Sequence, residues 1–218
     1  MQHYMAELNL LGQLVWVIGG GAVALRKVRG LLDTGARIVV VAPAWDPELT
    51  RWRDQGCLHI HQGEFSEADL DREPRPMLVF AATGDGGLNQ EIAACCRQRR
   101  MWCNSADNPE VSGFLVPAVV RRGDMTVAVG TRGASPALSR LLKERLDHDL
   151  EPGWQGLVAV FGAMRAEVVR RIPNRLHRQK FWRDTALAAE VQERYRFDEQ
   201  ESWFLARLDA ATARDHGS

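Results

Sequence analysis

The fold of this chain is decided by the stretch Leu14-Val15-Trp16-Val17-Ile18-Gly19-Gly20-Gly21-Ala22-Val23-Ala24. An apolar run of strand length ends in three glycines, and a helix-compatible segment begins directly after them. In the pattern G-x-G-x-x-A, Gly19 permits a tight turn, Gly21 lets a diphosphate approach the main chain, and Ala24 allows close helix–strand packing. The helix start would direct free N–H groups at the phosphates. The stretch therefore predicts a dinucleotide site, formed by Gly19, Gly20, Gly21, Ala22, Val23 and Ala24.

Strands and helices alternate along the chain up to about Asn104. The β-branched run over 37–41 predicts a strand buried on both faces. Further strands are expected over 58–61, 77–82 and 101–103, and helices over 22–34, 47–55 and 88–100. This alternation predicts an α/β, Rossmann-like, doubly wound parallel sheet, whose strand ends share one ligand-binding edge.

The pattern changes after Pro109. Two strands are expected over 114–120 and 125–129, then a helix over 137–150, and only helical spacing from Trp154 onward. A hairpin with one helix is too small to form its own core, so we expect a homodimer through this segment. The predicted domains are an NAD-binding domain (1–112), a small α+β dimerisation segment (113–150) and a C-terminal helical domain (151–218).

The composition is that of a soluble globular protein. The 218 residues balance 28 Lys+Arg against 28 Asp+Glu, which argues against a nucleic-acid partner. No run of about 20 apolar residues is present, so no membrane span is expected. The four cysteines lack C-x-x-C spacing, which indicates reduced thiols and a cytoplasmic location. His59 and His61 have no third ligand nearby in sequence, so no metal site is expected.

One element of the usual dinucleotide site is missing. An acidic residue about 20 positions after the glycines normally binds the ribose hydroxyls. Here the second strand is followed by Pro43 and Ala44, and the nearest acid is Asp46. No Arg stands at this strand tip to hold a 2′-phosphate, so the choice between NAD and NADP stays open. Main-chain groups of Pro43 and Ala44 are the candidates for the ribose contact, and a purely structural glycine turn is the alternative.

Several motifs together resemble a known family in their order and spacing. They are Gly19-Gly20-Gly21-Ala22-Val23-Ala24-Leu25-Arg26-Lys27, Ala81-Ala82-Thr83-Gly84-Asp85 followed by Asn89, Cys103-Asn104-Ser105-Ala106-Asp107, Phe114-Leu115-Val116-Pro117-Ala118, and Gly133-Ala134-Ser135-Pro136-Ala137-Leu138-Ser139-Arg140. The set resembles the precorrin-2 dehydrogenase / sirohydrochlorin ferrochelatase module of siroheme synthase, with Ser139 replacing the usual alanine. The resemblance extends from residue 7 to about residue 182.

The resemblance implies two reactions. Precorrin-2 is oxidised to sirohydrochlorin with NAD as cofactor, and in bifunctional members ferrous iron is then inserted as a substrate. Larger members carry a methyltransferase domain, and we expect no such activity in these 218 residues. Two alternatives are a non-catalytic regulator that binds a dinucleotide or a tetrapyrrole, and a cobalt- or haem-directed chelatase on the same fold.

Asp107 is the candidate catalytic residue. The resemblance implies a general acid/base, and we expect its pKa to be raised by desolvation in an apolar cleft. Its spacing alone favours an Asx turn or cap before Asn108 and Pro109, and the resemblance reverses this preference. The resemblance also implies that Ala82 and Thr83 lie beside the nicotinamide ribose, although this segment could be a simple turn.

The expected substrate carries many carboxylates, which guanidinium groups bind well. Substrate contacts are expected from Asn104, Ser105, Arg132, Ser135 and Arg140. Between 160 and 183, seven basic residues accompany one acid, Glu167. This segment is either an electropositive lid or a solvated helix face. Thr131 stands where some family members have a serine that can be phosphorylated, so such regulation is not expected here.

Overall fold

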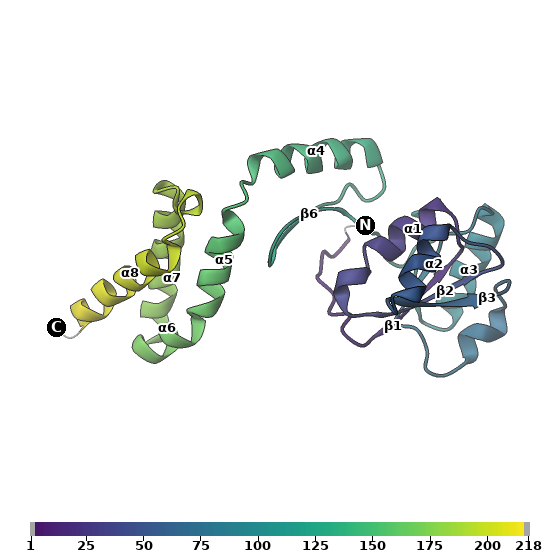
Figure 1. Cartoon of the computed structure of the whole chain (residues 1–218), viewed down its shortest axis with the longest axis horizontal. Coiled ribbons are helices and arrows are strands. Elements are labelled where there is room, and N and C mark those ends of the chain that lie inside the picture. Colours follow the sequence, from purple (N-terminus) through teal and green to yellow (C-terminus); the bar gives the residue numbers. More distant parts are fainter. Residues whose placement is uncertain (1–2, 216–218) are drawn as a thin grey trace. The chain divides into compact units, whose positions relative to one another are not determined.

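The computed structural model describes residues 3–215 and divides into two compact units, Met1–Val116 and Pro117–Ser218 (Figure 1). Each unit has hydrophobic clusters of its own. The expected three-part division, with boundaries at 112 and 150, stays a prediction. In the part of the chain that the structure describes, no helix has both the length and the hydropathy that a membrane crossing requires.

The first unit is built on a parallel sheet of five strands in the order β3-β2-β1-β4-β5. The strands are β1 Leu14–Ile18, β2 Arg37–Ala42, β3 Leu58–Gln62, β4 Leu78–Ala81 and β5 Trp102–Ser105. Val15 of β1 aligns with Ile38 on one side and with Leu78 on the other, so the strand order reverses beside β1. Ligands bind at the carboxyl ends of strands at such a reversal. The predicted fold class is confirmed.

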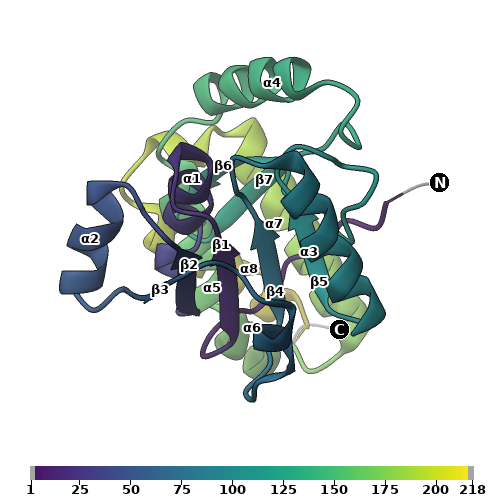
Figure 2. The same cartoon turned by 90° about the vertical axis from the view of Figure 1, so that its right-hand side faces the viewer.

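Helices cover both faces of this sheet (Figure 2). One face carries α1 Ala22–Arg29 and α2 Pro47–Asp54, which bury Val28 and Leu49. The other carries η2 Glu67–Asp71 and α3 Gly86–Gln98, which bury Leu70 and Ile92. A sheet covered on both faces explains why its central strands are continuously apolar rather than alternating.

Two expected elements differ in extent. The helix expected over 22–34 ends at Arg29, and a short 3-10 turn, η1 Leu32–Thr34, leads to Gly35. The strand expected over 114–120 is β6 Ala118–Arg122. Phe114 instead packs edge-on against Phe80, with ring centroids 5.4 Å apart, and its carbonyl accepts a hydrogen bond from a side chain of β5. Residues 114–116 therefore belong to the first unit.

The second unit consists of a hairpin followed by helices. β6 pairs antiparallel with β7 Met125–Val129. The helices that follow are α4 Pro136–Asp149, α5 Trp154–Ala163, α6 Arg165–Arg171, α7 Arg175–Val191, η3 Arg194–Arg196 and α8 Gln200–Asp215. Val168, Phe181 and Phe204 form the centre of the helical core. Trp182 packs against this core, and Trp154 stacks on Tyr195, so both tryptophans pack within the fold.

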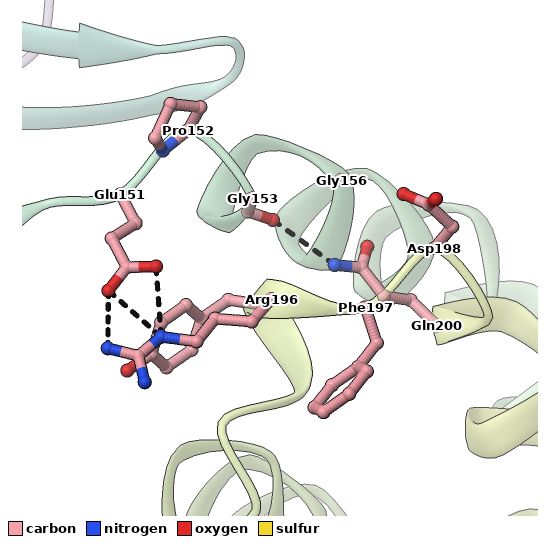
Figure 3. A pocket seen from close by; sticks show the side chains of 9 residues that line it. Glu151, Pro152, Gly153, Gly156, Arg196, Phe197, Asp198 and Gln200 are labelled. Carbon is pink, nitrogen blue, oxygen red and sulfur yellow. Dashed lines mark hydrogen bonds and ion pairs between the residues drawn. The ribbon is translucent and has the colours of Figure 1, made fainter.

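A hollow of about 470 Å³ lies where α5 and α8 meet (Figure 3). Glu151 and Arg196 form a two-point ion pair there, with Nη2 and Oε1 2.6 Å apart. The Gln200 amide donates to the carbonyls of Gly153 and Arg194 at 3.2 and 3.1 Å. These lining groups are thus paired with one another, which indicates a structural joint between the helices.

Candidate active site

The three glycines after β1 have three different surroundings. Gly19 has a φ of 121°, and a Cβ added there would lie 2.2 Å from the Ala82 carbonyl oxygen. A Cβ on Gly20 would lie 2.1 Å from the Ala44 carbonyl oxygen. A Cβ on Gly21 would meet nothing within 4 Å. Gly19 and Gly20 therefore let the ends of β4 and β2 approach the turn, whereas Gly21 leaves open space that a ligand can use.

The start of α1 is suited to an anion. Gly21 is its N-cap and offers no side-chain hydrogen bond, and the first turn contains no acidic residue. The first amides of a helix have no intrahelical partner, so those of Ala22 and Val23 can bind phosphate oxygens. Ala24 is fully buried, which brings the helix close to the sheet. These residues fit a diphosphate.

The end of β2 lies beside the glycine turn. The Asp46 N–H donates to the Gly20 carbonyl at 2.8 Å, while the Asp46 carboxylate accepts from the Glu48 N–H at 2.8 Å. Asp46 is therefore the N-cap of α2, and its side chain is used within the fold. Pro43 and Ala44 are exposed next to this turn. Their main chain is available to a ribose.

The end of β4 is held by a buried amide. The Thr83 N–H donates to Asn89 Oδ1 at 3.0 Å, and Thr83 Oγ1 lies 2.8 Å from the same oxygen. Asn89 is 1% exposed and belongs to α3. The sequence analysis assigned no role to Asn89. An amide side chain placed among the buried positions of an otherwise apolar helix face was the available signal.

Asp107 follows β5 and lies against the first residue of α3. Ser105 Oγ donates to Asp107 Oδ1 at 2.6 Å, and a Cβ on Gly86 would lie 2.8 Å from Oδ2. The pKa of Asp107 is lowered, first by this hydrogen bond from Ser105. Hydrogen bonds from Asn89 and from the amides of Asp107 and Asn108 lower it further and outweigh desolvation. The expected raised pKa is wrong, because Asp107 is exposed and surrounded by donors.

Asn104 and Lys27 join α1 to β5. Asn104 is 4% exposed, and its Oδ1 accepts from Lys27 Nζ at 2.8 Å. Its Nδ2 donates to the Phe114 carbonyl at 3.0 Å, so both ends of the amide are used inside the unit. The pKa of Lys27 is lowered by burial and then by the charge of Arg26. The sequence analysis missed this contact, although the motif contained the Arg-Lys pair.

The other predicted substrate residues belong to the second unit. Ser135 caps α4: its Oγ accepts from the Leu138 N–H at 3.2 Å, and its own N–H donates to Thr131 Oγ1. Arg132 has a positive φ of 55° in the preceding turn. Arg140 is exposed on α4. The hydroxyl of Ser135 thus has a structural use, and the two guanidinium groups are the charged members of this set.

Several basic residues between 160 and 183 are paired with groups of the same chain. Arg170 pairs with Glu167, Arg171 with Asp209, Arg183 with Asp184, and Arg178 donates to the Ile172 carbonyl. Self-pairing of this kind is typical of a solvated helix face. The electropositive lid stays a prediction.

The side chains that the structure describes form neither a candidate metal site nor a disulfide bond. No group of three or more His, Cys, Asp or Glu side chains gathers among residues 3–215 in a way that could hold a metal ion. Cys95, Cys96 and Cys103 are buried free thiols, and Cys57 is an exposed one.

Residues 7–118 match a family model described as "Putative NAD(P)-binding". Over 183 residues the chain is 41% identical to the siroheme synthase of Escherichia coli (strain SE11) and to that of Escherichia fergusonii (strain ATCC 35469). The match covers 84% of this chain but only 39% of each of these relatives. A solved structure entitled "SirC, precorrin-2 dehydrogenase" superposes with a TM-score of 0.71 at 25% identity, covering 95% of this chain and all of that one. The chain therefore belongs to the NAD(P)-binding family whose model it matches, in the group of siroheme synthases and precorrin-2 dehydrogenases that its motifs indicate.

Proposed function

We propose that this chain oxidises precorrin-2 to sirohydrochlorin with NAD. The observation that carries the proposal is the ionised Asp107 at the end of β5, on the same sheet edge as the open glycine turn after β1. The names of the relatives support the choice of substrate.

The proposed cofactor site uses three strand ends. The first amides of α1, beside Gly21, would bind the diphosphate. The main chain at Pro43 and Ala44 would bind one ribose, and Ala82 with Thr83 would lie beside the other. The segment between Val41 and Asp46 contains no Arg or Lys to hold a 2′-phosphate, which favours NAD over NADP. When bound, NAD supplies the hydride acceptor.

Asp107 would take the proton that leaves the macrocycle together with the hydride. A carboxylate with a lowered pKa is ionised at neutral pH, which is the form that can accept a proton, and it does so as a weaker base than an ordinary aspartate. Ser105 orients this carboxylate, and Asn104 supports the strand that carries it. Arg132 and Arg140 would pair with substrate carboxylates, and Ser135 would hold the turn between them.

Ferrous iron insertion is the second proposed activity. Insertion requires the pyrrole nitrogens to lose protons, and an ionised Asp107 could accept them. The siroheme synthase relatives support this step, with iron as a substrate. We also propose a cytoplasmic homodimer: free thiols favour a reducing compartment, and α4 exposes Leu138, Leu141 and Leu142.

The test uses the purified full chain with precorrin-2 and NAD under anaerobic conditions. NADH absorbance should rise only when both are present, and the visible spectrum should change to that of sirohydrochlorin. Ferrous ion, added afterwards, should produce the siroheme spectrum. Asp107→Asn should lower the rate of oxidation by about 100-fold or more and leave NAD binding unchanged.

Three results would count against the proposal. If NADH failed to form while NAD and sirohydrochlorin both bound, the chain would be a regulator. If Asp107→Asn retained the wild-type rate, another group would be the base. If cobalt alone entered sirohydrochlorin, the alternative chelatase would be correct.

A further inference from the structure

Asn89 is the amide on the buried face of α3. Its exposed fraction is 1%, and the other buried residues of this helix are Ile92, Ala93, Cys95 and Cys96. Asparagine is a poor helix former, and an amide buried on an apolar face destabilises the fold unless its hydrogen bonds are made. Packing alone would therefore favour a leucine at this position, and the partners of the amide indicate its role.

One set of contacts holds the main chain of Thr83. Asn89 Oδ1 accepts from the Thr83 N–H at 3.0 Å and lies 2.8 Å from Thr83 Oγ1, while Nδ2 donates to the Thr83 carbonyl at 3.4 Å. Both main-chain polar groups of Thr83 are thus paired with one side chain, as they would be with a neighbouring strand. β4 ends at Ala81, so Asn89 fixes the chain beyond the strand, where the nicotinamide ribose is proposed to bind.

The same side chain lies beside the carboxylate of Asp107. Asn89 follows Gly86 by three residues and shares its face of the helix, and a Cβ on Gly86 would lie 2.8 Å from Asp107 Oδ2. Asn89 also donates a side-chain hydrogen bond to Asp107, which lowers the pKa of that carboxyl. An amide nitrogen has two N–H groups, so Asn89 can donate to Thr83 and to Asp107 at once.

The neighbouring groups do not replace this contact. Ser105 Oγ donates to Asp107 Oδ1 at 2.6 Å, but one hydrogen bond leaves the carboxylate free to turn about it. A second contact from α3 restricts that rotation. Asp85, which precedes α3, is engaged elsewhere: its Oδ1 accepts from the N–H groups of Gly87 and Leu88 at 2.8 and 3.2 Å. Asn89 is therefore the side chain that connects the end of β4 to the base after β5.

We propose that Asn89 is a positioning residue, which holds the Thr83 main chain and the Asp107 carboxylate at a fixed separation. This inference rests on the proposed dehydrogenase function, in which a hydride and a proton leave the macrocycle in one oxidation. The hydride acceptor and the base must then keep their places relative to each other. A misplacement of about 1 Å can lower a rate by about 100-fold. Asn89 itself is buried and acts through its two partners.

Two substitutions separate the two contacts. Asn89→Asp keeps an oxygen for the Thr83 N–H at nearly constant size, but it removes the N–H donors and adds a carboxyl group beside Asp107. NAD affinity should stay close to that of the wild type, while kcat should fall about tenfold or more. The acid limb of kcat should move up by about one pH unit or more, because a second carboxylate raises the pKa of Asp107. Asn89→Leu removes both contacts, so NAD binding should also weaken about tenfold, since Thr83 is no longer preorganised.

Gln90, the exposed neighbour on α3, provides matched controls. Gln90→Glu adds the same charge and Gln90→Leu the same apolar side chain, one position away and facing solvent. Both should keep the wild-type rate, NAD affinity and acid limb. Thermal unfolding of every variant separates loss of function from loss of folding. A measurement on the wild-type chain needs no substitution at Asn89: the ¹H–¹⁵N resonances of its side chain should shift when NAD binds and should differ from those in Asp107→Asn.

The proposal is overturned if Asn89→Asp keeps the wild-type kcat and acid limb, or if Asn89→Leu binds NAD as tightly as the wild type. A purely structural role would lower the unfolding temperature of both variants and leave the acid limb in place. If the wild type formed no NADH, the dehydrogenase function would fail by itself. The NAD titrations and the Asn89 resonances would then still decide the role of Asn89, and resonances unmoved by NAD and by Asp107→Asn would exclude it.

Discussion

Gly20 and Gly21 are adjacent, yet only one of them has neighbours that a side chain would strike. A methyl group on Gly20 would meet the main chain at Ala44, whereas one on Gly21 would enter open space. Gly20→Ala should therefore lower the free energy of unfolding by about 1–3 kcal/mol, since overpacking shifts the backbone. Gly21→Ala should cost no more than about 1 kcal/mol, from a poorer N-cap. Denaturant unfolding without nucleotide measures both.

Gly21→Ala should also have a specific effect on NAD binding. The new methyl at Gly21 occupies the space through which the diphosphate approaches, so Gly21→Ala should weaken NAD binding about tenfold or more, which is about 1.4 kcal/mol. Calorimetric titration with NAD measures this loss. Equal affinity of the wild type and Gly21→Ala would show that the dinucleotide does not approach this turn.

The pKa of Asp107 gives a second prediction for single residues. The hydrogen bond from Ser105 is the largest cause of its lowering, so Ser105→Ala should raise the pKa toward the ordinary value of 3.8. Because the carboxylate is the active form, the acid limb of kcat/KM should move to higher pH. The rate at neutral pH should also fall, because Ser105 orients the carboxylate, so the position of the acid limb and not its height tests the pKa. The measurement is the pH profile of precorrin-2 oxidation.

Ser112→Ala is the matched control for this profile. Ser112 Oγ accepts from the Ser105 N–H at 2.9 Å and makes no bond to Asp107 among the described contacts. The acid limb should stay in place in this variant. An acid limb near neutral pH in the wild type would show instead that Asp107 is desolvated when the protein works.

At the scale of elements, α1 and β5 are coupled by one side-chain contact. Lys27→Met leaves the buried Asn104 Oδ1 without its donor, so the free energy of unfolding should fall by about 1–3 kcal/mol. Arg26→Met, at the exposed neighbouring position, should change it by less than about 0.5 kcal/mol. Denaturant unfolding at neutral pH provides the comparison.

The pH dependence of the same variants has a defined sign. The folded pKa of Lys27 lies below its ordinary 10.5, so between these two values the unfolded state binds more protons. The penalty of burying the charge is fully present below the folded pKa and is lost as the pH rises toward 10.5. Across this alkaline interval, the free energy of unfolding of the wild type should therefore rise relative to that of Lys27→Met. Parallel curves for the two proteins would contradict the assigned burial of the charge.

The elements that could be predicted are those with local signals. The strand that ends just before Gly19 is predicted by residues within a few positions of it. So is the helix that begins at Asp46 and Pro47, and both elements are present. The prediction that a strand starts at Phe114 was wrong, because the Phe114 ring packs against Phe80, which lies far away in sequence. The helix expected to reach Thr34 ends at Arg29, with Gly30 as its C-cap. The sequence did not predict this end, because a glycine at position 30 does not by itself indicate a helix break.

The same distinction, between features encoded by neighbouring residues and features that depend on distant ones, applies to the residues of the site. The turn at Gly21 could be found from its spacing, since the motif encodes its own geometry. The sign of the Asp107 pKa shift could not, because it depends on Ser105 and on Asn89, an α3 residue that only the folded sheet brings near. The role of Asn104 was obscured for the same reason: its partners, Lys27 and the Phe114 carbonyl, come from separate segments.

At the scale of the whole molecule, α4 exposes a row of leucine side chains. Of its 14 residues only Ser139 is buried, while Leu138, Leu141 and Leu142 are 46%, 61% and 37% exposed. Their spacing places them on one side of the helix. Burying a leucine contributes about 1.5–3 kcal/mol, so a second copy of this face would supply a strong driving force.

Leu141→Glu should therefore convert the proposed dimer to a monomer at micromolar concentration, because a carboxylate would be buried in the interface without a partner. Leu187→Glu, at a comparably exposed position on α7, should leave the dimer intact and serves as the matched control. Sedimentation velocity distinguishes the two states. A dimer that survives Leu141→Glu but dissociates with Leu187→Glu would assign self-association to the terminal helices, and a monomeric wild type would leave the leucines of α4 to a different protein partner.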